Sequence, residues 1–105
     1  MPSNVLNRED IGDIGDLSDL SDSFEIYRGM SHEEFISGDF GQSWSIDYEI
    51  ARRFAEDTYS DKPKGIVAKT IISKHEVLHY DKNKEFEVIV IKGSPRKSNV
   101  SIDRR

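Results

Sequence analysis

The chain has 105 residues and a formal net charge of −5, and it contains no cysteine. This length predicts one domain, and the lack of cysteine excludes disulfides, thiolate metal sites and cysteine nucleophiles. The longest aliphatic run, Val88–Ile91, is far shorter than the roughly 20 residues that a membrane helix needs. With no signal-peptide pattern and no basic stripe, we expect a cytoplasmic protein with neither a membrane nor a nucleic acid as its partner.

An acidic segment, residues 1–23, precedes the rest of the chain. Within it, aspartates and aliphatic residues recur with a period of three (Asp10, Asp13, Asp16, Asp19 and Asp22; Ile11, Ile14, Leu17 and Leu20). Because a step of three drifts by roughly 60° per repeat around a helix, no continuous apolar face forms. We therefore divide the chain into an acidic N-terminal extension, 1–23, and a folded domain, 24–105. The extension either docks aliphatic side chains on the domain or serves as an arm that binds a partner or mimics nucleic acid.

The domain begins with a strand followed by a short helix. Residues 24–27 alternate in polarity and predict a strand that runs into residues 28–29. Ser31 and Glu34 have the spacing of a capping box, which predicts the start of a helix. Gly38 then predicts the end of that helix.

A second helix follows a short connection. Residues 41–45 predict a brief strand or a turn. Residues 47–59 predict an amphipathic helix, one face of which is apolar (Ile50, Ala51, Phe54 and Ala55). A polar loop, 59–65, comes after it.

The remainder of the chain reads as strands, at residues 65–72, 76–80, 85–92 and 99–102. Two helices that come early and strands that come late argue against alternating βαβ units. The sequence therefore predicts an α+β fold with a mostly antiparallel sheet and two short helices.

The strand predicted at 85–92 opens with two glutamates. A period of two places Glu85 and Glu87 on one face, and Phe86 with the following valines on the other. Because a buried unpaired carboxylate is costly, these glutamates must meet water or a partner. Taken alone, they are explained as an exposed strand entrance near Lys82 and Lys84.

Three motifs together suggest a chemical role. Arg28 ends the first strand within Tyr27-Arg28-Gly29, Ser43-Trp44-Ser45 precedes a helix that contains Ala51-Arg52-Arg53-Phe54-Ala55, and Glu85-Phe86-Glu87 opens the late strand. In order and spacing, across roughly residues 24–92, this set resembles the mono-ADP-ribosyltransferase family in its arginine–serine–glutamate class. The resemblance implies an ADP-ribosyltransferase-like split sheet, NAD as substrate, no metal, and transfer of ADP-ribose to a protein side chain with release of nicotinamide.

The resemblance also implies a role for each motif residue. Glu87 would accept a hydrogen bond from the ribose 2′-hydroxyl, and Ser43 would hold Glu87. Arg28 would face the diphosphate or the adjoining ribose, and Gly29 would leave room for the nicotinamide carboxamide. Glu85 would orient or deprotonate the nucleophile, which in the family goes with an arginine acceptor.

The remaining motif residues are less specific. Ser45 either caps the second helix or supports the cleft. Trp44 stands where the best-known members carry threonine. Phe54 and Tyr59 are candidate aromatic contacts for nicotinamide, although the apolar face of the helix favours a core position for Phe54. The implied catalytic residues are thus Glu85 and Glu87, and the implied NAD-binding residues are Arg28, Gly29, Ser43, Trp44, Ser45 and Phe54.

Other functions remain open at this point. The same residues could hydrolyse NAD with water as the acceptor. A degenerate transferase fold, or the acidic extension, could act as a non-enzymatic binding or inhibitor module. An enzyme that modifies RNA ends would need a basic surface, which the sequence lacks. A small acidic protein of this kind would fit a bacterial or phage effector acting in a host cell, and the sequence leaves its acceptor and oligomeric state open.

Overall fold

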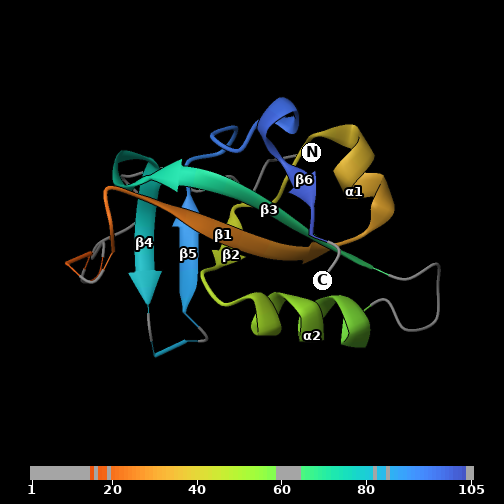
Figure 1. Ribbon diagram of the computed structural model, residues 1–105, viewed down its shortest axis with the longest axis horizontal. Coiled ribbons are helices and arrows are strands. Elements are labelled where there is room, and N and C mark those ends of the chain that lie inside the picture. The colour runs from red at the N-terminus through yellow and green to blue at the C-terminus, as the bar shows by residue number, and fades with distance from the viewer. Residues whose placement is uncertain are drawn as a thin grey trace, which may run out of the picture.

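A computed structural model describes residues 15, 17–18, 20–58, 65–81, 83–84 and 86–103 (Figure 1). These residues form one six-stranded sheet in the order β4-β5-β2-β1-β3-β6, and all pairings between neighbouring strands are antiparallel. The elements are β1 (Ser23–Met30), α1 (His32–Ser37), β2 (Ser43–Ser45), α2 (Tyr48–Thr58), β3 (Ile66–Ser73), β4 (Val77–Asp81), β5 (Glu87–Val90) and β6 (Ser101–Ile102), with 3₁₀ turns at Lys74–Glu76 and Lys97–Asn99. The predicted α+β class with a mostly antiparallel sheet and two short helices is confirmed.

The sheet consists of two three-stranded halves that meet at one point. β1 pairs with β3 along its whole length, from Ser23↔Ser73 to Met30↔Ile66. In contrast, β1 pairs with β2 only at Tyr27↔Ser45. We call this place the β1–β2 junction. Because one rung joins the halves there, the ends of β1 and β2 beyond it can border a pocket.

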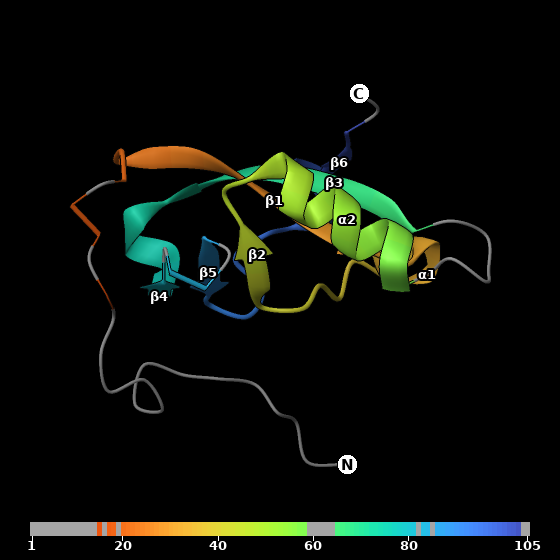
Figure 2. The same cartoon turned by 90° about the horizontal axis from the view of Figure 1, so that it is seen from below.

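Helix α2 covers one face of β1 and β3 (Figure 2). Gly29 on β1 allows this close packing, because a Cβ atom there would lie 2.5 Å from the Ala51 carbonyl oxygen and 2.7 Å from the Ala55 nitrogen. Ala51 and Ala55 are buried against Tyr27 and Val67. The main core lies on the opposite face, where Phe40 and Trp44 pack with aliphatic residues of the strands (Ile26, Met30, Ala68, Ile72, Val77, Val88 and Val90).

The predicted caps of α1 are present, whereas α2 is capped by Asp47 and not by Ser45. The Ser31 hydroxyl accepts a hydrogen bond from the Glu34 nitrogen at 3.1 Å, and Gly38 ends α1 in a left-handed conformation, with φ of 73°. Asp47 caps α2 by accepting a hydrogen bond from the Glu49 nitrogen at 2.9 Å. The predicted helix 47–59 thus begins one residue later, and residue 59 lies outside the described residues.

The strand predicted at 85–92 is shorter than expected. It begins at Glu87, because Phe86 has a φ of 53° and interrupts the extended backbone. Phe86 is therefore 39% exposed and does not share the core with Val88 and Val90, which corrects the predicted alternation at this point. Glu85 lies outside the described residues.

Part of the acidic extension packs on the domain. Gly15 forms an isolated bridge with Tyr80 on the edge strand β4. Leu20 is buried in the main core, and Leu17 packs against it. The extension thus docks aliphatic side chains as one of its two interpretations expected, while Ile11 and Ile14 lie outside the described residues. Within the described part of the chain, no helix is long and apolar enough to cross a membrane.

Candidate functional site

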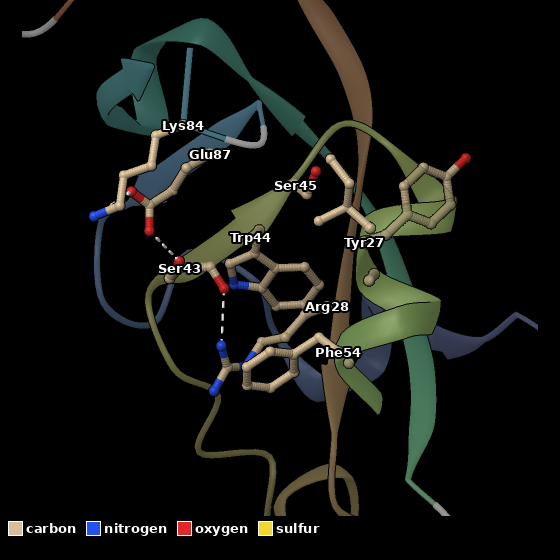
Figure 3. A pocket seen from close by; sticks show the side chains of 11 residues that line it. Tyr27, Arg28, Ser43, Trp44, Ser45, Phe54, Lys84 and Glu87 are labelled. Atoms are coloured by element: carbon tan, nitrogen blue, oxygen red, sulfur yellow. Dashed lines mark hydrogen bonds and ion pairs between the residues drawn. The ribbon is translucent and has the colours of Figure 1, made fainter. Parts of the chain in front are cut away.

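A pocket of about 340 Å³ lies at the β1–β2 junction, beside α2 (Figure 3). Of the eight residues that the sequence motifs nominate, seven line this pocket (Arg28, Gly29, Ser43, Trp44, Ser45, Phe54 and Glu87). The other pocket residues are Tyr27, Ile50, Ala51 and Lys84. Glu85 and Tyr59 lie outside the described residues.

Glu87 is held at the pocket by Ser43. The Ser43 hydroxyl donates a hydrogen bond of 2.6 Å to one carboxylate oxygen of Glu87. The pairing of β2 with β5 explains this contact, because Ser45 lies opposite Glu87 and Ser43 lies two residues along the same face. Lys84 approaches the other carboxylate oxygen at 3.8 Å, but its side chain is 74% exposed, so this pair is weak. The side chain of Glu87 remains 22% exposed.

Arg28 reaches across the β1–β2 junction from β1. Its Nη1 donates a hydrogen bond of 2.8 Å to the Ser43 carbonyl oxygen on β2. Its Nε and Nη2 donate to the two carboxylate oxygens of Glu34, at 2.7 and 3.2 Å. The side chain is 20% exposed, so the ion pair with Glu34 is partly shielded from solvent. Within the described part of the chain, the anionic partner of Arg28 is therefore a glutamate of α1.

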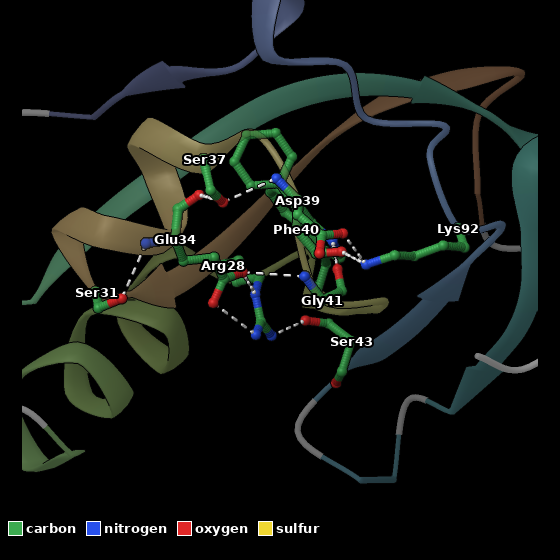
Figure 4. A network of polar contacts seen from close by, with 10 residues as sticks. Arg28, Ser31, Glu34, Ser37, Asp39, Phe40, Gly41, Ser43 and Lys92 are labelled. Carbon is green, nitrogen blue, oxygen red and sulfur yellow. Dashed lines mark hydrogen bonds and ion pairs between the residues drawn. The ribbon is translucent and has the colours of Figure 1, made fainter. Parts of the chain in front are cut away.

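Glu34 binds Arg28 next to the pocket (Figure 4), and the sequence did not identify it as a site residue. The capping-box pattern assigned its carboxylate to the N-terminus of α1, and only the Ser31 half of that box forms. The carboxylate instead accepts hydrogen bonds from Arg28 and, at 3.0 Å, from the Gly41 nitrogen. A guanidinium outcompetes a neutral N–H for a carboxylate, but no local pattern shows that Arg28 lies within reach.

The aromatic residues of the pocket differ in their exposure. Phe54 is 49% exposed at the pocket, so the core position that the sequence favoured for it is wrong. Trp44 is 2% exposed, stacks edge-on against Phe40 and donates an indole hydrogen bond of 2.8 Å to the Gly41 carbonyl oxygen. Trp44 is thus a fixed wall, whereas Phe54 offers an exposed ring.

Ser45 supports the start of α2, because its hydroxyl accepts a hydrogen bond of 3.0 Å from the Asp47 nitrogen. Ser45 is therefore not the cap of α2, and its hydroxyl instead holds the capping residue Asp47. On the outer face of α2, away from these contacts, hydrogen bonds from Arg52 to Glu49 and then to Glu56 raise the pKa of Arg52 above its usual value. That exposed pair of bonds follows the helical i, i+3 and i, i+4 spacing.

The pocket combines a held carboxylate, one edge of a guanidinium and apolar walls. Such a site can hold an anionic group at the guanidinium and place a negative charge beside a developing positive charge. Comparisons of the chain with protein-family models, with curated proteins and with solved structures find no match.

Proposed function

We propose that this protein is an NAD-dependent mono-ADP-ribosyltransferase that modifies a protein side chain and releases nicotinamide. The observation that carries the proposal is the gathering of seven motif residues in one pocket, although they are spread from Arg28 to Glu87 along the chain. Such motifs are individually common, and chance matches have no reason to converge on one cavity. The pocket volume also falls within the range of roughly 300–1,000 Å³ found for small-molecule sites.

Glu87 is the proposed catalytic residue. Cleavage of the bond between nicotinamide and ribose develops positive charge on the sugar, as in glycoside hydrolysis. Nicotinamide leaves as a neutral molecule from a pyridinium, so no strong general acid is needed. A carboxylate about 4 Å from the developing charge contributes at most about 4 kcal/mol at an effective dielectric constant near 20. This corresponds to a rate factor of up to roughly 10³.

The other pocket residues bind and orient the substrate in this proposal. Ser43 holds one oxygen of Glu87, which leaves the second oxygen for the ribose 2′-hydroxyl. Arg28 directs its unused N–H groups at the diphosphate or the adjoining ribose. The exposed ring of Phe54 offers a surface for nicotinamide.

The proposed acceptor is a protein side chain. Glu85 is assigned to it from the motif alone, with a protein arginine as the expected acceptor. If water reaches the ribose instead, the same pocket makes the protein an NAD glycohydrolase. If the pocket binds no NAD, the alternative is a non-enzymatic binding module, for which the acidic extension is the first surface to test.

The test is release of nicotinamide from NAD by the wild type and by Glu87→Gln, with and without a lysate of candidate host cells. Gln keeps the size of the side chain and removes its charge, so we expect a decrease of about 10²-fold or more. Glu33→Gln is the matched control, because Glu33 is exposed on α1 and is absent from the pocket lining. Release that requires lysate indicates a transferase, and release without it indicates a glycohydrolase. A wild type that releases no nicotinamide, and whose melting temperature NAD does not raise, would contradict the proposal.

A further inference from the structure

We propose that Glu34 is a positioning residue that fixes the Arg28 guanidinium in the pocket, so that its free N–H groups are presented to an anionic group of the ligand. This inference rests on the proposed function only for the identity of the ligand. The orientation of Arg28 itself can be tested without any ligand.

The hydrogen-bond inventory of Arg28 supports this role. A guanidinium has five N–H groups. Glu34 accepts from Nε and from one N–H of Nη2, and the Ser43 carbonyl oxygen accepts from one N–H of Nη1. One N–H on each terminal nitrogen is left without a hydrogen bond to the described residues, and Arg28 lines the pocket. Glu34 thus occupies the inner edge of the guanidinium and leaves donors at its outer end.

The surroundings of Glu34 show that its carboxylate is not a simple surface group. It accepts three hydrogen bonds, two from Arg28 and one from the Gly41 nitrogen. The side chain is only 18% exposed, although α1 has no fully buried residue. These contacts join α1, β1 and the segment that leads into β2 around one guanidinium.

Gly41 leaves room for the guanidinium of Arg28. A Cβ atom at this position would lie 2.4 Å from Nη2 and 2.7 Å from Cζ of Arg28. The glycine therefore lets the guanidinium lie against the backbone, while its N–H holds the carboxylate that orients the guanidinium. Gly41 thus supports the position of Arg28 both by leaving room for the guanidinium and by binding Glu34.

Fixing Arg28 has a physical advantage for binding. A free arginine side chain loses rotamer entropy when it binds an anion, and a guanidinium that is already held loses little. Glu34 also balances the charge of Arg28. Binding at this place then depends on directed hydrogen bonds, so the reach of Glu34 matters as well as its charge.

The experiment compares Glu34→Asp and Glu34→Gln with the control variants Glu33→Asp and Glu33→Gln. Asp keeps the charge but is one methylene too short to accept both hydrogen bonds from Arg28, whereas Gln keeps the length and removes the charge. Calorimetry with ADP-ribose measures affinity, and the NMR signal of the Arg28 Nε–H measures orientation. We expect both Glu34 variants to lose the slowly exchanging Nε–H signal and to bind ADP-ribose about tenfold more weakly. We expect the KM for NAD to rise by a similar factor while kcat changes by less than about threefold, and both Glu33 variants to match the wild type.

Several results would overturn the inference. If Glu34→Asp has unchanged affinity and an intact Nε–H signal, the paired hydrogen bonds between Glu34 and Arg28 are not needed to orient Arg28. Tighter binding by Glu34→Gln would show that Glu34 competes with the ligand. If the wild type binds neither ADP-ribose nor NAD, the proposed function fails, and the Nε–H signal still decides whether Glu34 orients Arg28. If Glu34→Gln does not fold, the Asp variant decides both readouts.

Discussion

Gly29→Ala tests the close approach of α2 to β1. The added methyl group would lie 2.5 Å from the Ala51 carbonyl oxygen and 2.7 Å from the Ala55 nitrogen. Both are backbone atoms of α2, so they cannot rotate away, and the helix must shift or the strand must bend. Inserting a methyl group into well-packed structure costs about 1–3 kcal/mol. At about 2 kcal/mol, the melting temperature of a domain of this size should fall by about 8–16 °C.

Thermal unfolding followed by far-UV circular dichroism measures this effect. Gly93→Ala is the comparison, since nothing lies within 4 Å of a Cβ there and the only cost is its φ of 89°. That conformation costs a non-glycine residue roughly 1–2 kcal/mol, so Gly93→Ala should melt no lower than Gly29→Ala. A Gly29→Ala protein that melts within 2 °C or so of the wild type, a shift worth well under ~1 kcal/mol, would refute the packing argument. Gly29 would then be explained only by its place in the pocket.

Three further predictions concern the pocket and the docked extension. Ser43→Ala removes the hydrogen bond to Glu87 and should slow nicotinamide release by roughly tenfold or more. The control Ser98→Ala, at an exposed serine, should release nicotinamide at the wild-type rate. Equal rates in the two variants would show that Ser43 has no part in the mechanism. Trp44 is the one tryptophan of the chain and lines the pocket, so titration with NAD should change the tryptophan fluorescence in a saturable way. If calorimetry detects NAD binding while the fluorescence stays constant, NAD binds elsewhere. Gly15→Ala would bring a Cβ to 2.0 Å from the Tyr80 carbonyl oxygen and so break the bridge between Gly15 and β4. Amide hydrogen exchange in β4 should then become faster. Unchanged exchange would mean that the bridge does not protect β4.

Local signals predicted the helix boundaries well. The Ser31 cap and the Gly38 terminator act through neighbouring backbone atoms, so their effect is visible in a few letters of sequence. The alternation of β1 was equally clear, but its length was not, since pairing with all eight residues of β3 extends it to Met30. Strand length here depends on a partner that lies far along the chain.

Tertiary contacts explain what the sequence did not show. Glu34 was assigned to a local capping box, and Arg28, brought close by the fold, takes its carboxylate instead. Phe86 fits an alternating strand in the sequence, yet its positive φ delays the strand by two residues. The order of the motifs along the chain was enough to predict most of the pocket residues. The contact between Ser43 and Glu87 could not be predicted from the residues themselves, because it depends on the register in which β2 pairs with β5.

The position of β5 in the sheet has a consequence for how the protein acquires its pocket. β5 is synthesised after β4 and β2, yet it lies between them, and the Ser43–Glu87 contact closes a loop of 44 residues. Because β3 ends at Ser73 and β5 begins only at Glu87, a growing chain can pair β1 with β3 before Glu87 has been synthesised. Under the proposed function, the chain would remain inactive until Glu87 is in place, and the onset of nicotinamide release would report the insertion of β5 between β4 and β2.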